Sequence, residues 1–357
     1  MEKNTYDLKG IGARFRIVGD YVTGCPYGSG HINDTFAVTY NQGGVYVRYV
    51  FQRINHRIFK NPPALMDNVD RVTSHQRRKL LVAGASATRR ALEVVRTVDN
   101  QAFHKDADGN FWRVYVFIER ARTYDVIETP AQAYQAARSF GVFQQLVADL
   151  PGPRLHETIP DFHHTVKRFQ ALEKAIEADS QNRAKLVKKE IDFALERKKD
   201  AGHLIELGAA GKIPERITHN DTKLNNVMID DETGEGICVI DLDTVMPGFS
   251  LYDFGDLVRT STSFGAEDER DLSKVKFQEP MYKALLDGFL AGTDGVLNKT
   301  EVDLLLFGGK IMTFEVGIRF LTDFLSGDVY FKIHREGHNL DRCRTQLELV
   351  RQIEQFL

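Results

Sequence analysis

Short apolar and polar runs alternate along the first third of the chain, separated by glycine and turn residues. Between residues 21 and 53 the runs TFAVTY and VYVRYVF are rich in β-branched and aromatic residues, which predicts antiparallel strands. The runs ALEVVRTV, around Val94, and FWRVYVFIE, at 111–119, predict two more strands on either side of a turn. Between these pairs, Pro62-Pro63 opens a segment whose apolar residues recur at helical spacing.

Helical spacing dominates the remaining two-thirds. Thr129-Pro130 supplies a capping hydroxyl and a proline at the first helical position, and the helix it begins ends before Pro151. Further helices are predicted around 163–177, 181–210, 279–292, 300–325 and 339–356. The pattern therefore predicts an α+β fold with two lobes, an antiparallel-sheet N-lobe at 1–119 and a larger, mainly helical C-lobe at 120–357.

Composition changes this picture little. The chain has 357 residues, 42% of them apolar, and a formal charge of -3, so it can bury a large core and lacks the basic excess of nucleic-acid-binding proteins. No window approaches the ~20 apolar residues of a membrane span, and the first residues lack a secretion signal. Three distant cysteines, Cys25, Cys238 and Cys343, fit reduced thiols. We expect a cytoplasmic enzyme with no membrane or nucleic-acid partner, and a monomer, although no motif determines the oligomeric state.

The most informative segment is ITHNDTKLNNVMI, at 217–229, where two apolar runs flank a polar loop. It contains a His, an Asp two residues later and an Asn five residues after that, namely His219, Asp221 and Asn226. This is the spacing of a kinase catalytic loop, in which the Asp receives the acceptor's hydroxyl proton and the Asn ligates magnesium. Lys223 falls where a lysine can meet the transferred phosphoryl group. The alternative is a surface turn rich in Asn and Asp, but four matched positions favour the kinase.

A second acid follows at the expected distance. The β-branched run GICVIDLDTV, at 236–245, ends in Asp241 and Asp243, and we assign the Mg²⁺ ligand to Asp241, with Asn226 as its partner. The tripeptide Asp253-Phe254-Gly255 resembles the metal motif of protein kinases but lies one element too late. We predict a structural role here, with Asp253 or Asp256 either capping a helix or hydrogen-bonding the catalytic loop from behind.

A glycine-rich turn near the N-terminus is typical of nucleotide sites. Gly28, Ser29 and Gly30 lie in a predicted hairpin, where their backbone can approach phosphate groups. A tight turn that needs positive φ is the ordinary alternative, but the catalytic loop downstream favours the nucleotide. His31 and Asn33 follow and can point into the cleft, although His31 is equally explained as a solvated turn residue. Phe117 to Glu119 is the predicted hinge, with backbone groups that pair with adenine.

Two positions leave alternatives open. Glu315 and Arg319 stand four apart in a late helix, where they form either an intrahelical ion pair or, if this face lines the cleft, a fixed donor group for substrate oxygens. The third strand lacks the usual lysine for the α- and β-phosphates, and Gln52 or Arg53 occupies that place. Arg53 would need an acidic partner such as Asp67 or Asp70, and the strand register decides whether it faces the cleft.

Taken together, YGSGHIN, WRVYVFIE, ITHNDTKLNNV, IDLDTVMPG, YDFGD and EVGIRFL followed by GDVYF resemble the N-acetylhexosamine 1-kinases, within the aminoglycoside phosphotransferase and choline kinase-like superfamily. The resemblance covers nearly the whole chain. It implies a bilobal kinase fold and Mg²⁺-dependent transfer of the ATP γ-phosphate to the anomeric hydroxyl of N-acetylglucosamine or N-acetylgalactosamine.

The same resemblance implies roles for individual residues. Asp221 would orient the acceptor hydroxyl, Asn226 and Asp241 would hold magnesium, and Gly28 and Gly30 would cover the phosphates. The sugar pocket would be lined by His31, Asn33, Arg319 and Tyr330. Two other functions stay open, a kinase of another small alcohol, such as a different sugar, an aminoglycoside or an amino alcohol, and a nucleotide-binding pseudokinase. A cationic acceptor would call for an acidic pocket, and a pseudokinase normally lacks a base or metal residue. No motif distinguishes the gluco from the galacto acceptor.

Overall fold

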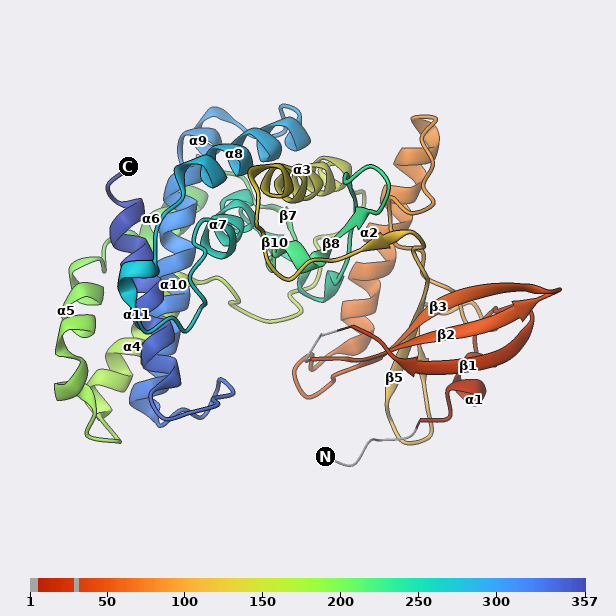
Figure 1. Cartoon of the computed structure of the whole chain (residues 1–357), viewed down its shortest axis with the longest axis horizontal. Coiled ribbons are helices and arrows are strands. Elements are labelled where there is room, and N and C mark those ends of the chain that lie inside the picture. The colour runs from red at the N-terminus through yellow and green to blue at the C-terminus, as the bar shows by residue number, and fades with distance from the viewer. Residues whose placement is uncertain (1–5, 29–31) are drawn as a thin grey trace.

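The sheet region comes first in the chain. The computed structural model describes residues 6–28 and 32–357, and within them the early strands form a five-stranded antiparallel sheet in the order β1-β2-β3-β5-β4. The strands are β1 (Asp20–Pro26), β2 (Asp34–Gln42), β3 (Val45–Ile54), β4 (His104–Lys105) and β5 (Phe111–Val116). Figure 1 shows this sheet at one end of the molecule, with helix α2 (Pro62–Val82) beside it. The predicted strands at 21–53 and 111–119 and the helix opened by Pro62 are confirmed.

The two faces of the sheet pack against different helices. One face forms a core with α1 (Leu8–Gly12), made mainly by Leu8, Ile11, Val38, Phe51, Trp112 and Val114. The other face joins the large core of the protein through α2, with contributions from Ile54, Leu65, Val69, Val72 and Tyr115. Because side chains alternate along a strand, Arg113 lies between Trp112 and Val114 in sequence but on the opposite face, toward α2.

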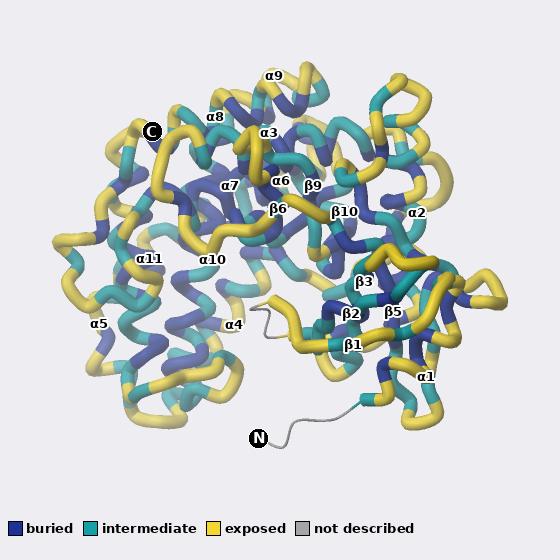
Figure 2. Tube along the Cα trace, turned by 45° about the vertical axis from the view of Figure 1, so that its right-hand side comes forward, coloured by how far each residue is buried: buried dark blue, intermediate teal, exposed yellow. Residues whose placement is uncertain are grey.

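Helices make up most of the chain after residue 121. They are α3 (Pro130–Val147), α4 (Thr165–Ala178), α5 (Lys188–Glu196), α6 (Asp200–Ala209), α7 (Ser250–Ser261), α8 (Glu279–Thr293), α9 (Lys299–Asp303), α10 (Leu305–Ser326) and α11 (His338–Ile353). Helix α10 lies at the centre, packed against α4, α7 and α11, and is buried along most of its length (Figure 2). The sheet region and the helical region together confirm the predicted α+β fold class. The boundary at residue 119 stays a prediction.

Two small sheets hold the catalytic segments together. In one, β8 (Val227–Asp230) pairs with β9 (Gly236–Val239) and with β6 (Ala121–Arg122); in the other, β10 (Met246–Gly248) pairs with β7 (Arg216–Thr218). The Ile240 N–H also donates to the Asn226 carbonyl at 2.9 Å. The loop between β7 and β8 and the turn between β9 and β10 are therefore fixed side by side.

Helix α7 owes its position to a close approach of backbones. A Cβ atom on Gly255 would lie 2.3 Å from the Gly308 carbonyl oxygen of α10, so only glycine permits this contact. The approach brings Asp253, in the first turn of α7, beneath the catalytic loop.

Some predicted elements differ in the structure. The run around Val94 forms no continuous strand, because its hydrogen bonds are divided between β5, through Val95, and the segment 14–16, through Arg96 and Val98. The predicted helix at 181–210 is split into a 3₁₀ turn (Ala184–Val187), α5 and α6, and the helix at 300–325 is interrupted at Leu304. The helix begun by Thr129 is confirmed, with a capping box formed by Thr129 and Gln132.

None of the helices in residues 6–28 and 32–357 is long and apolar enough to cross a bilayer.

Candidate active site

The catalytic loop is held from behind by a buried carboxylate. Asp253, fully buried, accepts hydrogen bonds from the backbone N–H groups of His219 (2.9 Å) and Asn220 (2.7 Å) and from Gln144 Nε2 (2.7 Å). The predicted hydrogen bond to the loop is thus confirmed, whereas the alternative of a helix cap is wrong, because Asp253 lies inside the first turn of α7. The Asp253-Phe254-Gly255 tripeptide positions the loop.

His219 is a structural member of the loop. Its ring packs edge-on against Phe140 and Phe143, with no exposed surface. Its Nε2 donates to the Ile240 carbonyl at 2.9 Å, and its Nδ1 accepts the Asp221 N–H at 3.3 Å. The ring therefore ties the loop to the turn that carries Asp241.

Replacing Asp253 with Ala is expected to destabilise the protein strongly. The two loop N–H groups would lose their acceptor inside the protein, and each buried unsatisfied group costs about 1–3 kcal/mol, so we expect a loss of about 2–6 kcal/mol in the free energy of unfolding. Chemical denaturation measures this value. Asp287→Ala is the control, since Asp287 is an exposed acid of α8 and should change stability by less than about 0.5 kcal/mol. Equal stability of the two variants would contradict the role given to Asp253.

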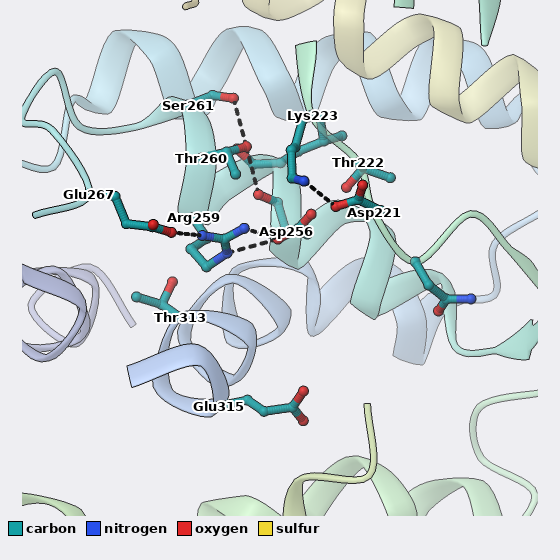
Figure 3. A network of polar contacts seen from close by, with 12 residues as sticks. Asp221, Thr222, Lys223, Asp256, Arg259, Thr260, Ser261, Glu267, Thr313 and Glu315 are labelled. Atoms are coloured by element: carbon teal, nitrogen blue, oxygen red, sulfur yellow. Dashed lines mark hydrogen bonds and ion pairs between the residues drawn. The ribbon is translucent and has the colours of Figure 1, made fainter. Parts of the chain in front are cut away.

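Asp221 and Lys223 form an ion pair at the surface of the loop, with Lys223 Nζ 2.7 Å from Asp221 Oδ1. Figure 3 shows Lys223 between Asp221 and the region of Asp256, which is itself paired with Arg259 at 2.7 Å. Desolvation by the surrounding protein would raise the pKa of Asp221, but the Lys223 ammonium lowers it below the ordinary value. Asp221 is therefore ionised at neutral pH and able to accept a hydrogen bond from an alcohol.

Asn226 and Asp241, the predicted Mg²⁺ ligands, lie beside Asp221. Asn226 Nδ2 donates to the Asp221 carbonyl at 2.8 Å and to its carboxylate at 3.2 Å, which leaves the amide oxygen available. The carboxylate of Asp241, at a left-handed turn with φ 59°, accepts no hydrogen bond from the described residues. Desolvation and the neighbouring acids Asp243 and Asp221 raise the pKa of Asp241 to about 6.

This donor set fits a hard divalent cation. A cation would relieve the repulsion between the acids, and Mg²⁺ is usually bound by one or two protein oxygens together with phosphates and water. The described residues contain no cluster of three or more His, Cys, Asp or Glu side chains arranged for a metal.

Asp243 is engaged in a different way. It lies two residues after Asp241, 3% exposed, and forms a fully buried ion pair with Arg113 of β5. Asn33 Nδ2 also donates to its second oxygen at 2.7 Å, while Asn33 Oδ1 accepts the Asn55 N–H at 3.0 Å. Asn33, a predicted substrate ligand, is thus brought to the active site but contacts Asp243. Sequence reasoning missed Arg113; the signal was a charged residue inside the apolar run FWRVYVFIE.

The residues predicted to bind the nucleotide lie in the turn between β1 and β2 and directly after β5. β1 and β2 form a hairpin, and Gly28, in the turn between them, has a positive φ of 82° with open space around it. Ser29, Gly30 and His31 lie outside the described residues. At the predicted hinge, Phe117 is buried between Tyr27, with ring centroids 5.3 Å apart, and the Arg48 guanidinium, and the Glu119 carboxylate forms an ion pair with Arg48 at 2.5 Å. The Glu119 side chain is therefore occupied. Two backbone groups of the hinge also have partners, because the Phe117 N–H donates to the Arg48 carbonyl at 3.2 Å and the Glu119 carbonyl accepts from Arg89 Nε at 3.0 Å. The pairing of this hinge with adenine stays a prediction.

Arg319 and Tyr330 lie together around Phe331. The Arg319 guanidinium is 5.6 Å from the Phe331 ring and 5.9 Å from that of Phe162, and the Tyr330 ring is 4.7 Å from Phe331. In the part of the chain that the structure describes, Arg319 forms no ion pair with an acid, and Tyr330 is exposed. Burial, together with Arg319 nearby, lowers the pKa of Arg168, whose buried Nε has no partner among the described residues.

Of the two alternatives for Glu315 and Arg319, the intrahelical ion pair does not form among the described residues. Glu315 is fully buried and accepts hydrogen bonds from His163 Nδ1 (2.9 Å) and Thr165 Oγ1 (2.6 Å). The other ring nitrogen of His163 faces the Asn220 carbonyl at 3.0 Å. This network connects α10, one turn before Arg319, to the catalytic loop one residue before Asp221.

Comparison with known proteins agrees with this geometry. The family model described as the phosphotransferase enzyme family (APH) matches residues 23–287, well over half of the chain. The chain belongs to this phosphotransferase family. The match includes the glycine-rich turn, the hinge, the catalytic loop and the Asp241 turn, and it makes the protein a small-molecule kinase of this family.

Solved structures of other phosphotransferases share the fold at low sequence identity. An aminoglycoside phosphotransferase from Alicyclobacillus acidocaldarius is similar with a TM-score of 0.65 and 13% identity, over 99% of this chain and 97% of that one. A microcompartment-associated aminopropanol kinase gives a TM-score of 0.58 and 14% identity, over 98% and 96%. Spectinomycin phosphotransferase APH(9)-Ia, in complex with ADP and spectinomycin, gives 0.52 and 13%, over 94% of each chain.

Proposed function

We propose that this phosphotransferase transfers the γ-phosphate of ATP to the anomeric hydroxyl of N-acetylglucosamine or N-acetylgalactosamine, with Mg²⁺ as cofactor. The motifs around Asp221, Asp241 and Arg319, which resemble those of N-acetylhexosamine 1-kinases, support the choice of acceptor. ATP as donor is supported by the glycine turn and the hinge, and by the ADP bound in the structurally similar spectinomycin phosphotransferase.

The observation that carries the choice of a neutral acceptor is the state of the acids at 253–271. A cationic aminoglycoside or amino alcohol would need unpaired acids, and the chain has several in this segment. Each of these acids has a partner inside the protein. Asp253 accepts from the loop N–H groups, Asp256 and Glu267 both pair with Arg259, and Asp268 pairs with Arg335. Glu269 pairs with Lys274, and Asp271 accepts from the Ser273 N–H.

Two arginines of the helical region also favour a neutral acceptor. Arg168 and Arg319 lie near Tyr330, and Arg319 has no acidic partner among the described residues. A guanidinium with free donors recognises hydroxyl and carbonyl oxygens and repels an ammonium group. The hydroxyls and the acetamido oxygen of an N-acetylhexosamine match such donors.

Each residue of the catalytic loop and of the Asp241 turn has a separate role in the proposed reaction. The ionised Asp221 accepts a hydrogen bond from the acceptor hydroxyl, orients its oxygen toward the γ-phosphorus and receives its proton as the new O–P bond forms. The bond between the γ-phosphorus and the oxygen that bridges to the β-phosphate breaks, and ADP leaves. Lys223 places a positive charge beside that oxygen. Asn226 and Asp241 would hold Mg²⁺, which neutralises charge on the phosphate oxygens when it is bound. Phosphoryl transfer needs mainly such positioning and charge neutralisation.

The test is ATP consumption with Mg²⁺ across N-acetylglucosamine, N-acetylgalactosamine, glucose, galactose, an aminoglycoside and choline, followed by phosphorus NMR of any product. We expect turnover of the N-acetyl sugars and a phosphorus signal coupled to the anomeric proton. Turnover of the aminoglycoside or choline alone would overturn the neutral acceptor and leave the family assignment. No turnover of any acceptor, with ATP still bound, would favour the pseudokinase.

A further inference from the structure

The kinase pattern predicts a cation on the third strand, β3, but in this protein a different strand supplies the cation that contacts the Asp241 turn. In β3, Gln52 occupies the inward position where a lysine is usual; its Nε2 donates to Thr35 Oγ1 at 3.0 Å. Arg53 pairs with Asp34 at 2.6 Å, and not with Asp67 or Asp70. Neither side chain offers a cation to the active site.

The cation comes from the neighbouring strand. Arg113 of β5 lies directly opposite Gln52 in the antiparallel ladder, and its Nε donates to Gln52 Oε1 at 3.0 Å. Its Nη1 pairs with Asp243, and neither residue of this ion pair is more than 3% exposed. Burial would lower the pKa of Arg113, but Asp243 beside it raises the pKa above the ordinary value, so the guanidinium is charged.

Stability alone does not explain this buried ion pair. Two charges withdrawn from water lose their hydration, and apolar residues of similar volume often stabilise a core as well or better. What the pair adds is a fixed geometry. It joins β5 to the short 3₁₀ turn Leu242–Thr244, which directly follows Asp241, and Asn33 joins the end of the glycine turn to the same carboxylate.

We propose that Arg113 is a positioning residue of this phosphotransferase, which holds the Asp241 turn in its metal-binding geometry through Asp243. Each carboxylate oxygen of Asp243 accepts a hydrogen bond, one from Arg113 and the other from Asn33. Asp243 serves as the anchor, and Asp241 presents its oxygens. Because Arg113 belongs to β5 and Asn33 directly precedes β2, the anchor joins two separate segments of the sheet region to the Asp241 turn.

The test compares Arg113→Met, Arg113→Lys, Asp243→Asn and the double variant Arg113→Met/Asp243→Asn with the wild type. The main readout is Mn²⁺ binding in the presence of ADP, followed by electron paramagnetic resonance, which needs no acceptor. We expect Arg113→Met to weaken Mn²⁺ binding and to lower kcat about 10–100-fold, the range seen when residues supporting metal ligands are lost, with a smaller change in KM for ATP. Arg113→Lys should recover part of both, and the double variant should be no worse than Arg113→Met.

The control is Arg96→Met, which removes another ion pair of the sheet region, to Asp70 at 2.5 Å, away from the Asp241 turn. It should leave Mn²⁺ binding and kcat unchanged. If folded Arg113→Met and Asp243→Asn bind Mn²⁺ as the wild type does, the positioning role is wrong. The positioning role is also wrong if the losses of Mn²⁺ affinity in Arg113→Met and Asp243→Asn multiply in the double variant. Multiplying losses would mean that the two residues act independently, and not through one shared ion pair. Failure of the sugar assay leaves the Mn²⁺ readout interpretable, so the two proposals fail separately.

Discussion

Asp221→Asn is expected to lower kcat about a thousandfold while ATP binding is retained. The amide keeps the shape of the side chain but cannot take a proton, and it no longer attracts Lys223, which pairs with the carboxylate at 2.7 Å. Steady-state kinetics with the best acceptor of the panel gives kcat, and calorimetry gives the affinity for ATP. The backbone of the loop is held by Asp253, so the fold around the substitution should be unchanged.

Asp287→Asn is the matched control, because this exposed acid of α8 is remote from the loop. It should keep the wild-type kcat. Wild-type turnover by Asp221→Asn would show that another group receives the proton, and the mechanism given above would be wrong. A parallel loss of ATP affinity would instead indicate that the substitution disturbs the nucleotide site.

Asp241→Ala is expected to abolish Mg²⁺-dependent turnover, by about a thousandfold or more, because the cation loses its carboxylate ligand. The protein itself should be as stable as the wild type or more stable. Surrounding protein and the acids Asp243 and Asp221 raise the pKa of Asp241 to about 6, which means that its ionised form is disfavoured in the folded protein. At pH 7, above this pKa, removing the carboxylate removes that unfavourable term.

Thermal unfolding without Mg²⁺ and Mg²⁺ titration of the activity measure the two effects separately. Asp241→Ala should lose activity while it keeps or gains stability, as expected when a catalytic residue destabilises the fold. Asp253→Ala should lose both activity and stability. If Asp241→Ala unfolds at a much lower temperature, its acid is structural. If it keeps Mg²⁺-dependent activity, the ligand lies elsewhere.

The features that the sequence alone determined are those that depend on the spacing of nearby residues. The loop from His219 to Asn226, the strand that precedes Asp241 and the glycine turn each depend on residues close together in the sequence. The chemistry of phosphoryl transfer requires those residue types at those distances. Helix starts such as Thr129-Pro130 are local in the same sense, because the capping hydroxyl acts within its own turn.

Tertiary structure decided which partner each charged group takes. Glu315 has Arg319 one helical turn away, yet its carboxylate binds His163 and Thr165, about 150 residues earlier in the chain. Asp243 takes Arg113, 130 residues away, and Asp253 the loop N–H groups. A buried charge must find a partner in the folded protein, and which one it meets depends on how helices and sheet pack. Spacing in the sequence predicts the reacting groups, while only packing places the residues that hold them.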